Sequence, residues 1–242
     1  RKDMAVLFSR VGFKQTAEWK EEIVYFDRAA VGDAGQTVEV AFPDGKRIEL
    51  SPDQDPRKVF ADWLTGPKNR WFAQNMANRA WYWLLGRGII HEPDDIRAEN
   101  KPSNPPLLAY LERELIDSKC DLKHLFRLIL NSNAYQLSSI PRSNRPQAEP
   151  QFSYYPVRRL EAEVLIDALC GITGTTESYS SLIPEPFTFV PESQRTIALA
   201  DGSISSSFLD LFGRPPRDTG LLEERDNNPS AAQRLHFLNS SH

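Results

Sequence analysis

The segment from Asn69 to Arg97 constrains the fold most strongly, because it places aromatic rings, short amides and an arginine on one helix. It reads NRWFAQNMANRAWYWLLGRGIIHEPDDIR. Four polar residues recur at positions i, i+3, i+4 and i+7 and form one stripe: Asn75, Asn78, Arg79 and Tyr82. The opposite side carries small or apolar residues: Ala73, Ala77, Ala80 and Leu84. A solvated helix face is normally rich in Lys and Glu, so this stripe is expected to face polar partners inside the protein.

Two interpretations of the stripe are open. In the first, it is one wall of a ligand pocket, with Arg79 holding an anion and Trp81 or Trp83 stacking on a sugar ring or an aromatic ligand. In the second, its amides and guanidinium hydrogen-bond the carbonyls of proline-rich loops and hold those loops in place. The second interpretation is favoured.

The motif HEPDDIR brings four candidate ligands together just after a Gly-Arg-Gly turn: His91, Glu92, Asp94 and Asp95. Carboxylates this close are typical of a calcium site or of an acid and base pair. The EF-hand spacing DxDxDG is absent, however, and Arg79 and Arg97 are near in sequence. We therefore favour ion pairs between these aspartates and Arg79 or Arg97, and we expect no metal site.

The first 54 residues are expected to contain a small antiparallel sheet. Residues 37–42 alternate in hydropathy, residues 43–46 supply a turn, and the alternation resumes to Leu50, which predicts a β-hairpin. Residues 21–27 have strand propensity and would add a third strand. A small β-containing segment therefore covers residues 1–54.

Residues 55–242 are expected to form an irregular multi-helix domain with long Pro-rich loops. Helices are predicted from residue 55 or 56 to the Gly-Pro at 66–67, at about 71–85, from Ser103 through Pro105-Pro106, and after Asp121 as N-cap. A loop follows over about 132–156. Two shorter helices are predicted, one over 205–212 and one capped by Ser230 that contains Leu235 and Leu238.

Another helix is predicted to carry Leu160, Val164, Ala168 and Ile172 toward the core and to end at Gly171 and Gly174. Arg159, Glu163 and Asp167 align on one face of it, which is typical of solvated ion pairs. Glu161 and Glu163 diverge at positions i and i+2, so a hydrolytic partner for either would have to come from elsewhere, for example Asp94 or Asp95. The arginines of FGRPPR and EERDNNPS, residues 212–217 and 223–230, are expected at the surface.

Composition limits the function. The 242 residues carry a formal net charge of −4 with both signs interspersed, so neither a nucleic-acid partner nor insertion into a membrane is expected. Two cysteines, Cys120 and Cys170, lack the CxxCH pattern of covalent haem, and no cofactor is expected; a disulfide between them is possible in an oxidising compartment, but two unbonded residues are favoured. Signatures of serine hydrolases, nucleotide-binding loops and zinc proteases are absent from the sequence.

Several blocks along the chain carry a family resemblance. They begin with DPRKVFADWL and the segment from Asn69 to Arg97. They continue with DLKHLFRLILNSNAYQLSS, YYPVRRLEAEVLIDAL, DGSISSSFLDLFGRPPR, a Glu-Arg pair and QRLHFLNS. In this order they resemble the planctomycete-type C-terminal domain of unknown function found in large exported proteins, downstream of cytochrome-like and immunoglobulin-like modules. This chain reads TGLLEER where the family usually has a nearby cysteine, so no role for that cysteine is carried over. Family members also continue past LHFLNS, which implies that the last helix here lacks packing partners.

The resemblance implies an exported protein, periplasmic or at the cell surface, that works beside other domains. The leading expectation is a non-catalytic accessory or interaction domain whose partners are neighbouring domains of the same polypeptide or complex. The alternative is a carbohydrate-active or other hydrolytic enzyme with a pocket of carboxylates and arginines. The residues of this polar network or ligand pocket are Asn75, Asn78, Arg79, Trp81, Asp94, Asp95, Arg97, Arg159 and Glu163. An electron-transfer partner of a cytochrome-like module is a third hypothesis, based on family context alone.

Overall fold

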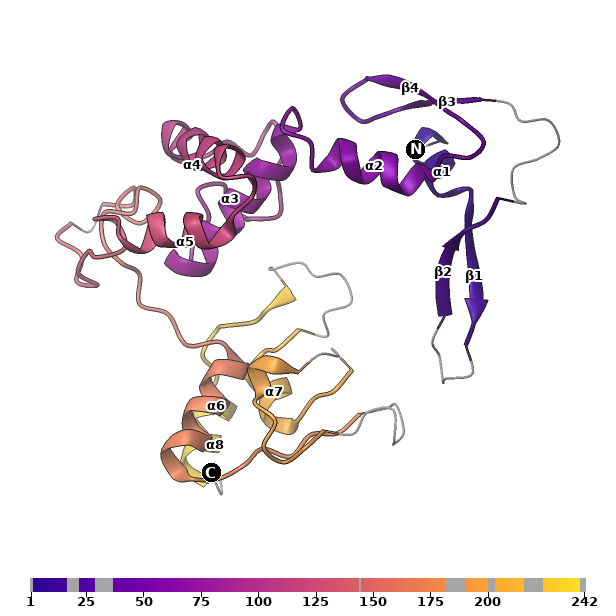
Figure 1. Cartoon of the computed structure of the whole chain (residues 1–242). Coiled ribbons are helices and arrows are strands. Elements are labelled where there is room, and N and C mark those ends of the chain that lie inside the picture. Colours follow the sequence, from indigo (N-terminus) through magenta and orange to yellow (C-terminus); the bar gives the residue numbers. More distant parts are fainter. Residues whose placement is uncertain are drawn as a thin grey trace. The chain divides into compact units, whose positions relative to one another are not determined.

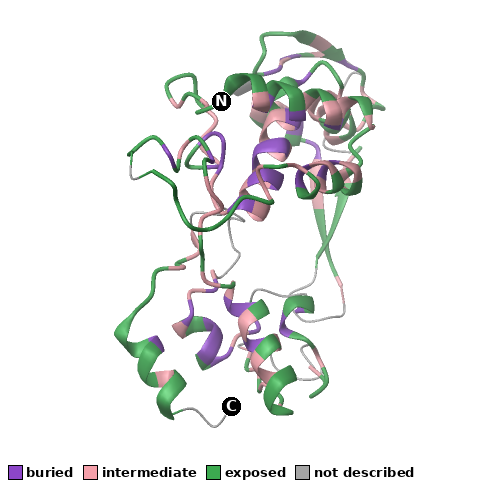
Figure 2. Ribbon diagram, turned by 90° about the vertical axis from the view of Figure 1, so that its left-hand side faces the viewer, coloured by how far each residue is buried: buried purple, intermediate pink, exposed green. Residues whose placement is uncertain are grey.

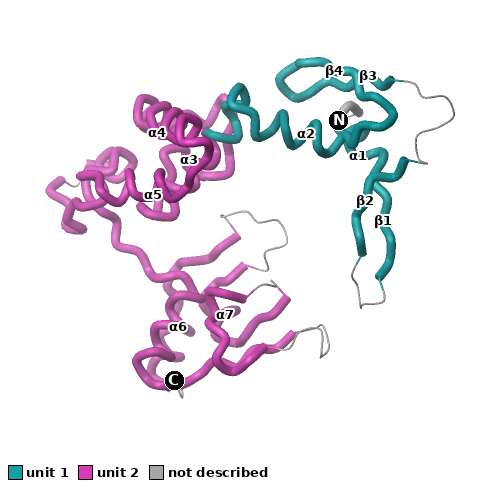
Figure 3. Tube along the Cα trace, in the orientation of Figure 1, with its two compact units in different colours: residues 1–73 teal, residues 74–242 magenta. Residues whose placement is uncertain are grey.

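The computed structural model describes residues 2–16, 22–28, 37–143, 145–181, 190–199, 203–215 and 224–239. The chain divides into two compact units, residues 1–73 and residues 74–242 (Figure 3). The described part is mainly helical, and its strands lie within the first 50 residues (Figure 1). The predicted fold class, mainly α with a small N-terminal antiparallel β component, is confirmed.

Unit 1 contains two separate two-stranded antiparallel sheets. In one, β1 (Val11–Gln15) pairs with β2 (Glu22–Phe26); in the other, β3 (Val38–Ala41) pairs with β4 (Arg47–Leu50). The predicted hairpin is β3–β4. The predicted third strand exists as β2, but it joins β1 rather than the hairpin, so the three-stranded alternative is wrong.

The turn between β3 and β4 has the chemistry that the sequence indicates. Gly45 takes φ +84, a conformation that costs glycine little, and its backbone amide donates to the Phe42 carbonyl at 2.8 Å. The Asp44 carboxylate accepts from the Lys46 amide at 2.9 Å and from the Trp63 indole N–H at 2.8 Å. The second contact joins the turn to the next helix.

The core of unit 1 combines α1 (Lys2–Phe8), the hairpin and α2 (Pro56–Leu64). Its buried residues are Leu7, Val40, Phe42 and Leu50, and Val59, Phe60 and Trp63 of α2 pack against them. The Trp63 ring stacks on Phe42 with 4.8 Å between centroids. The sequence pattern changes at residue 54, but the compact unit continues through α2 to residue 73, because α2 covers the apolar side of the hairpin.

Of the remaining helices, α3 begins in unit 1 and continues into unit 2, and the others lie in unit 2. The remaining helices are α3 (Arg70–Leu85), α4 (Pro105–Asp117), α5 (Leu122–Leu130), α6 (Ala162–Thr173), η1 (Thr196–Ala198), α7 (Ser207–Leu211) and α8 (Ala231–Asn239). The predicted Asp121 cap is present, since its carboxylate accepts from the amides of Lys123 and His124 at 2.8 and 3.1 Å. Ser230 likewise accepts from the Gln233 amide at 3.2 Å. The longer helices combine buried and exposed positions (Figure 2).

The buried side of α6 differs from the prediction. Ala162 and Ile166 are fully buried and pack with Phe208 and Phe212, whereas Ile172 is 83% exposed. The predicted core positions Leu160, Val164 and Ala168 are also exposed. The prediction was wrong because the helix begins at Ala162 and a second apolar row lies on its other side. Gly174, at φ +71, ends the helix as predicted.

Residues 131–156 contain no helix or strand in their described part, which agrees with the predicted loop. Cys120 and Cys170 are unbonded, and Cys120 is exposed. Among the described residues, none of the helices combines the length and apolar character needed to cross a bilayer.

Candidate functional site

Asn78 holds the loop that follows α3. Its side chain is fully buried, and the amide nitrogen donates to the carbonyls of Ile90 and Pro93 at 3.0 and 3.1 Å. The amide oxygen accepts from the Ile90 backbone N–H at 2.9 Å. One side chain therefore satisfies three backbone groups of a segment that forms no regular structure. This is the arrangement that the loop-fixing interpretation predicts.

The neighbouring charges of this loop are paired. Arg79 contacts Asp94 through two nitrogens, at 2.7 and 2.5 Å, and the two side chains are 24% and 9% exposed. Asp95 forms a separate bidentate pair with Arg97 at 2.5 and 2.7 Å, in which the Arg97 side chain is 71% exposed. The favoured ion pairs are present. Within the described ranges, no three His, Cys, Asp or Glu side chains converge on a point that would hold a metal ion.

The other members of the stripe are placed differently. Asn75 is half-buried and takes no part in these contacts. Trp81 is 2% exposed and meets Phe152 edge to face at 5.1 Å, so its ring faces are not open to a stacking sugar as the pocket interpretation expected.

Burial raises the pKa of the Tyr82 hydroxyl, and the negative charge of Glu161 raises it further. Burial lowers the pKa of nearby His91, and the positive charge of Arg87 adds to this effect.

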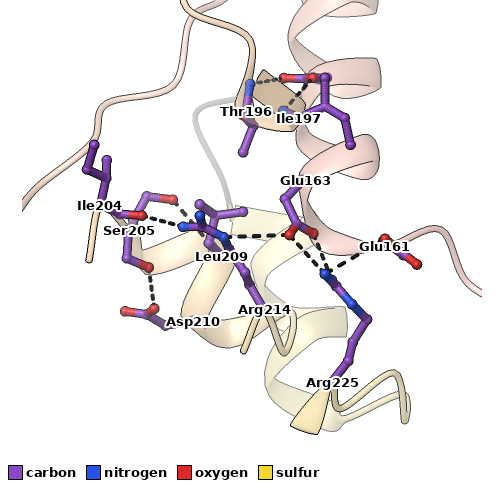
Figure 4. A network of polar contacts seen from close by, with 12 residues as sticks. Glu161, Glu163, Thr196, Ile197, Ile204, Ser205, Leu209, Asp210, Arg214 and Arg225 are labelled. Carbon is purple, nitrogen blue, oxygen red and sulfur yellow. Dashed lines mark hydrogen bonds and ion pairs between the residues drawn. The ribbon is translucent and has the colours of Figure 1, made fainter. Parts of the chain in front are cut away.

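A second polar network surrounds Glu163 at the start of α6 (Figure 4). Its side chain is 1% exposed, and its two oxygens accept from the two terminal nitrogens of Arg225 at 2.7 and 2.9 Å. Arg214 lies 3.6 Å from the same carboxylate and also donates to the carbonyl of Ile204. Two arginines thus compensate one buried carboxylate, and Glu161 approaches Arg225 at 3.8 Å as a second negative charge.

The charge of this network is fixed by its own contacts. Burial alone would lower the pKa of the Arg225 guanidinium, but the hydrogen bonds to Glu163 and the charges of Glu161 and Glu163 outweigh it and raise that pKa. A guanidinium held in this way stays protonated across the physiological range. Glu163 therefore has a permanent cationic partner.

The predicted row of Arg159, Glu163 and Asp167 does not form. Arg159 precedes α6, and its guanidinium donates instead to the Gln233 side chain at 2.5 Å and to the Phe212 carbonyl at 2.8 Å. Asp167 accepts from the Thr196 and Ile197 amides at 2.7 and 3.2 Å, which caps η1. The row was predicted to be solvated, and this was wrong because each side chain bonds segments later in the chain instead of its neighbours along α6.

The segments that meet at Glu163 all lie within one family match. A family model described as PSD1, a protein of unknown function (DUF1553), matches residues 56–242. The chain belongs to this family. No curated protein and no solved structure matches it.

Three motif blocks of this PSD1 chain meet at Glu163. The glutamate comes from RRLEAEVLIDAL, Arg214 from FGRPPR and Arg225 from the Glu-Arg pair. Sequence reasoning placed both arginines at the surface, because no apolar residues surround them in sequence. The signal that could have identified them was the fixed order of the blocks, since charged residues in widely separated motifs are candidates for one buried network.

Proposed function

We propose that this PSD1 chain is a non-catalytic interaction domain of a larger exported bacterial protein. The observation that carries the proposal is the outer side of α8, where Leu235 and Leu238 are 58% and 80% exposed. The inner side of the same helix is anchored, because Gln233 is buried and donates to the Leu211 carbonyl at 2.9 Å. Neighbouring exposed apolar side chains on an anchored helix are typical of a surface that a partner covers.

The alternative, a hydrolase built on carboxylates and arginines, gains no support from the same geometry. Glu163 and Asp94 are 1% and 9% exposed and each is bonded to arginine. A general acid or base must be within hydrogen-bond reach of its substrate. Both carboxylates instead serve contacts inside the chain, and a carbohydrate ligand has no open site on them.

The partner that fits best is a neighbouring domain of the same polypeptide or complex. The resemblance to domains that follow cytochrome-like and immunoglobulin-like modules favours such a neighbour, and it is also the basis for an exported, periplasmic or cell-surface location. An apolar contact between linked domains needs little affinity, because linkage supplies a high effective concentration. A few exposed apolar side chains are enough for such a contact.

Hydrogen exchange tests the proposal. The backbone amides of residues 231–239 are measured in this chain alone and in a longer chain that carries the neighbouring domains of its parent protein. Docking is expected to slow exchange in α8 several-fold, because a covered helix opens less often. Unchanged exchange throughout α8 would contradict the assignment.

Matched variants locate the contact. Leu235→Ser and Leu238→Ser are expected to abolish the added protection while leaving the fold intact, because both side chains are exposed. Ile172→Ser on α6, where the side chain is 83% exposed, is the control and is expected to retain it. Loss of protection in the control variant would show that the effect is not specific to α8.

A further inference from the structure

A pocket of about 580 Å³ lies beside α4 and α5, and Trp81 of α3 contributes to its wall. Most of the lining is apolar: Leu107, Tyr110, Leu111, Leu128 and Ile129. Its volume is in the range of small-molecule sites, roughly 300–1,000 Å³. Eleven residues line it, whereas a protein interface of ordinary size uses about 20–30 residues on each side. The dimensions favour a small molecule over a protein partner.

One cation of the lining has no partner in the described part of the chain. Arg127 is exposed, and its guanidinium makes no hydrogen bond or ion pair there, although its backbone carbonyl is used by Asn131. His124, the other basic residue of the lining, is already paired with Glu114 at 3.1 Å. An apolar pocket with a single available guanidinium is suited to an apolar molecule that carries one carboxylate.

The end of α5 would oppose an anion if its carbonyls were open, because a helix C-terminus carries partial negative charge. Two lining residues donate hydrogen bonds to carbonyls at this end of the helix. The Asn131 side chain donates to the Arg127 carbonyl at 2.7 Å, and the Ser132 hydroxyl donates to the Ile129 carbonyl at 2.6 Å. The local repulsion is thereby reduced, and the full charge of Arg127 dominates the electrostatics of the rim.

Trp81 adds ring surface to the wall of the pocket. Its indole nitrogen has no hydrogen-bond partner among the described residues, but it is closed to solvent and therefore does not open into the pocket.

We propose that the pocket between α4 and α5 binds a small aromatic carboxylate, with its ring among the leucines and its carboxylate on Arg127. The half-exposed ring of Tyr110 in the lining favours a planar aromatic body over a flexible chain. This site is separate from the apolar side of α8, and its test does not depend on a protein partner.

Calorimetric titration of the whole chain with 2-naphthoate and with uncharged 2-naphthamide tests the proposal. The two probes share the ring system and differ in charge. Naphthoate is expected to bind about tenfold more tightly, because it alone forms the charge-assisted contact with Arg127. Binding of neither probe would overturn the proposal.

Three variants separate the contributions. Arg127→Gln is expected to remove the tenfold preference while naphthamide binding is unchanged, whereas Lys123→Gln, an exposed cation on the same helix outside the pocket, retains the preference. Ala134→Phe, which fills the pocket from the following turn, is expected to weaken both probes. Equal affinity of the two probes, or a preference that survives Arg127→Gln, would show that Arg127 does not recognise a carboxylate here.

Discussion

Two arginine and aspartate pairs involve the loop that follows α3, and they differ mainly in burial. Arg79 and Asp94 are 24% and 9% exposed, whereas Arg97 is 71% exposed beside Asp95. Removing one partner of a largely buried pair leaves the other charge poorly solvated. Arg79→Ala is therefore expected to lower the free energy of unfolding by about 2–3 kcal/mol.

Arg97→Ala provides the matched control for Arg79→Ala. It removes the arginine that pairs with the adjacent aspartate, but solvent screens this exposed pair, so a loss below about 0.5 kcal/mol is expected. Urea unfolding of both variants measures the difference. Equal effects of the two substitutions would show that burial does not distinguish the pairs, and an unchanged midpoint and slope for Arg79→Ala would favour a ligand role for that residue.

Asp94 and Asp95 also give a prediction about metal. Both carboxylates are bonded to arginine, so calcium would have to displace a cation that is already in place. Added calcium and added EDTA are each expected to leave the melting temperature unchanged. A rise of several degrees with calcium that is lost in Asp95→Asn would instead reveal a site, because a ligand of the folded state stabilises it by mass action.

At the scale of elements, the end of α6 contains two glycines with opposite requirements. Gly171 lies within the helix and Gly174 follows it at φ +71, and a Cβ at either position would meet no other atom within 4 Å. Gly171→Ala is expected to stabilise the chain by about 0.5–1 kcal/mol through helix propensity. Gly174→Ala is expected to destabilise it by about 1 kcal/mol, because alanine tolerates a left-handed conformation poorly.

Thermal unfolding of the two glycine variants reports the sign of each effect. Space around the new methyl group is equal for both, so opposite signs isolate the backbone conformation as the cause. If both substitutions stabilised the chain, α6 would extend past Gly174, contrary to the structure.

Elements with strong local signals could be predicted from sequence. The β3–β4 hairpin and the Asp121 and Ser230 caps depend on residues close together in the chain, and all three are present. The pairing of β2 with β1 and the buried side of α6 could not be predicted in the same way. Both depend on which remote segment supplies the partner surface. The local hydropathy pattern is compatible with two partner strands for β2 and with two buried sides for α6.

At the scale of the whole molecule, the same distinction applies to the candidate site. Asn78 and Arg79 lie on α3, and Asp94 lies in the loop that follows this helix. Reasoning from one helix and its following loop predicted their contacts. The partners of Glu163 lie 51 and 62 positions away, in segments that resemble charged surface loops. Such long-range pairing is decided by the packing of α6 with the later segments, which local spacing does not reveal.

The central claim is that the buried charges of this PSD1 chain hold remote segments together instead of serving chemistry. A double-mutant cycle of Glu163→Gln and Arg225→Gln, measured by urea unfolding, tests it most directly. Each single substitution is expected to cost about 3 kcal/mol, and the double variant is expected to lose at least about 1 kcal/mol less than the sum, because the second change removes a charge that the first left unpaired. Additive losses, or a fully stable Glu163→Gln variant, would contradict the claim.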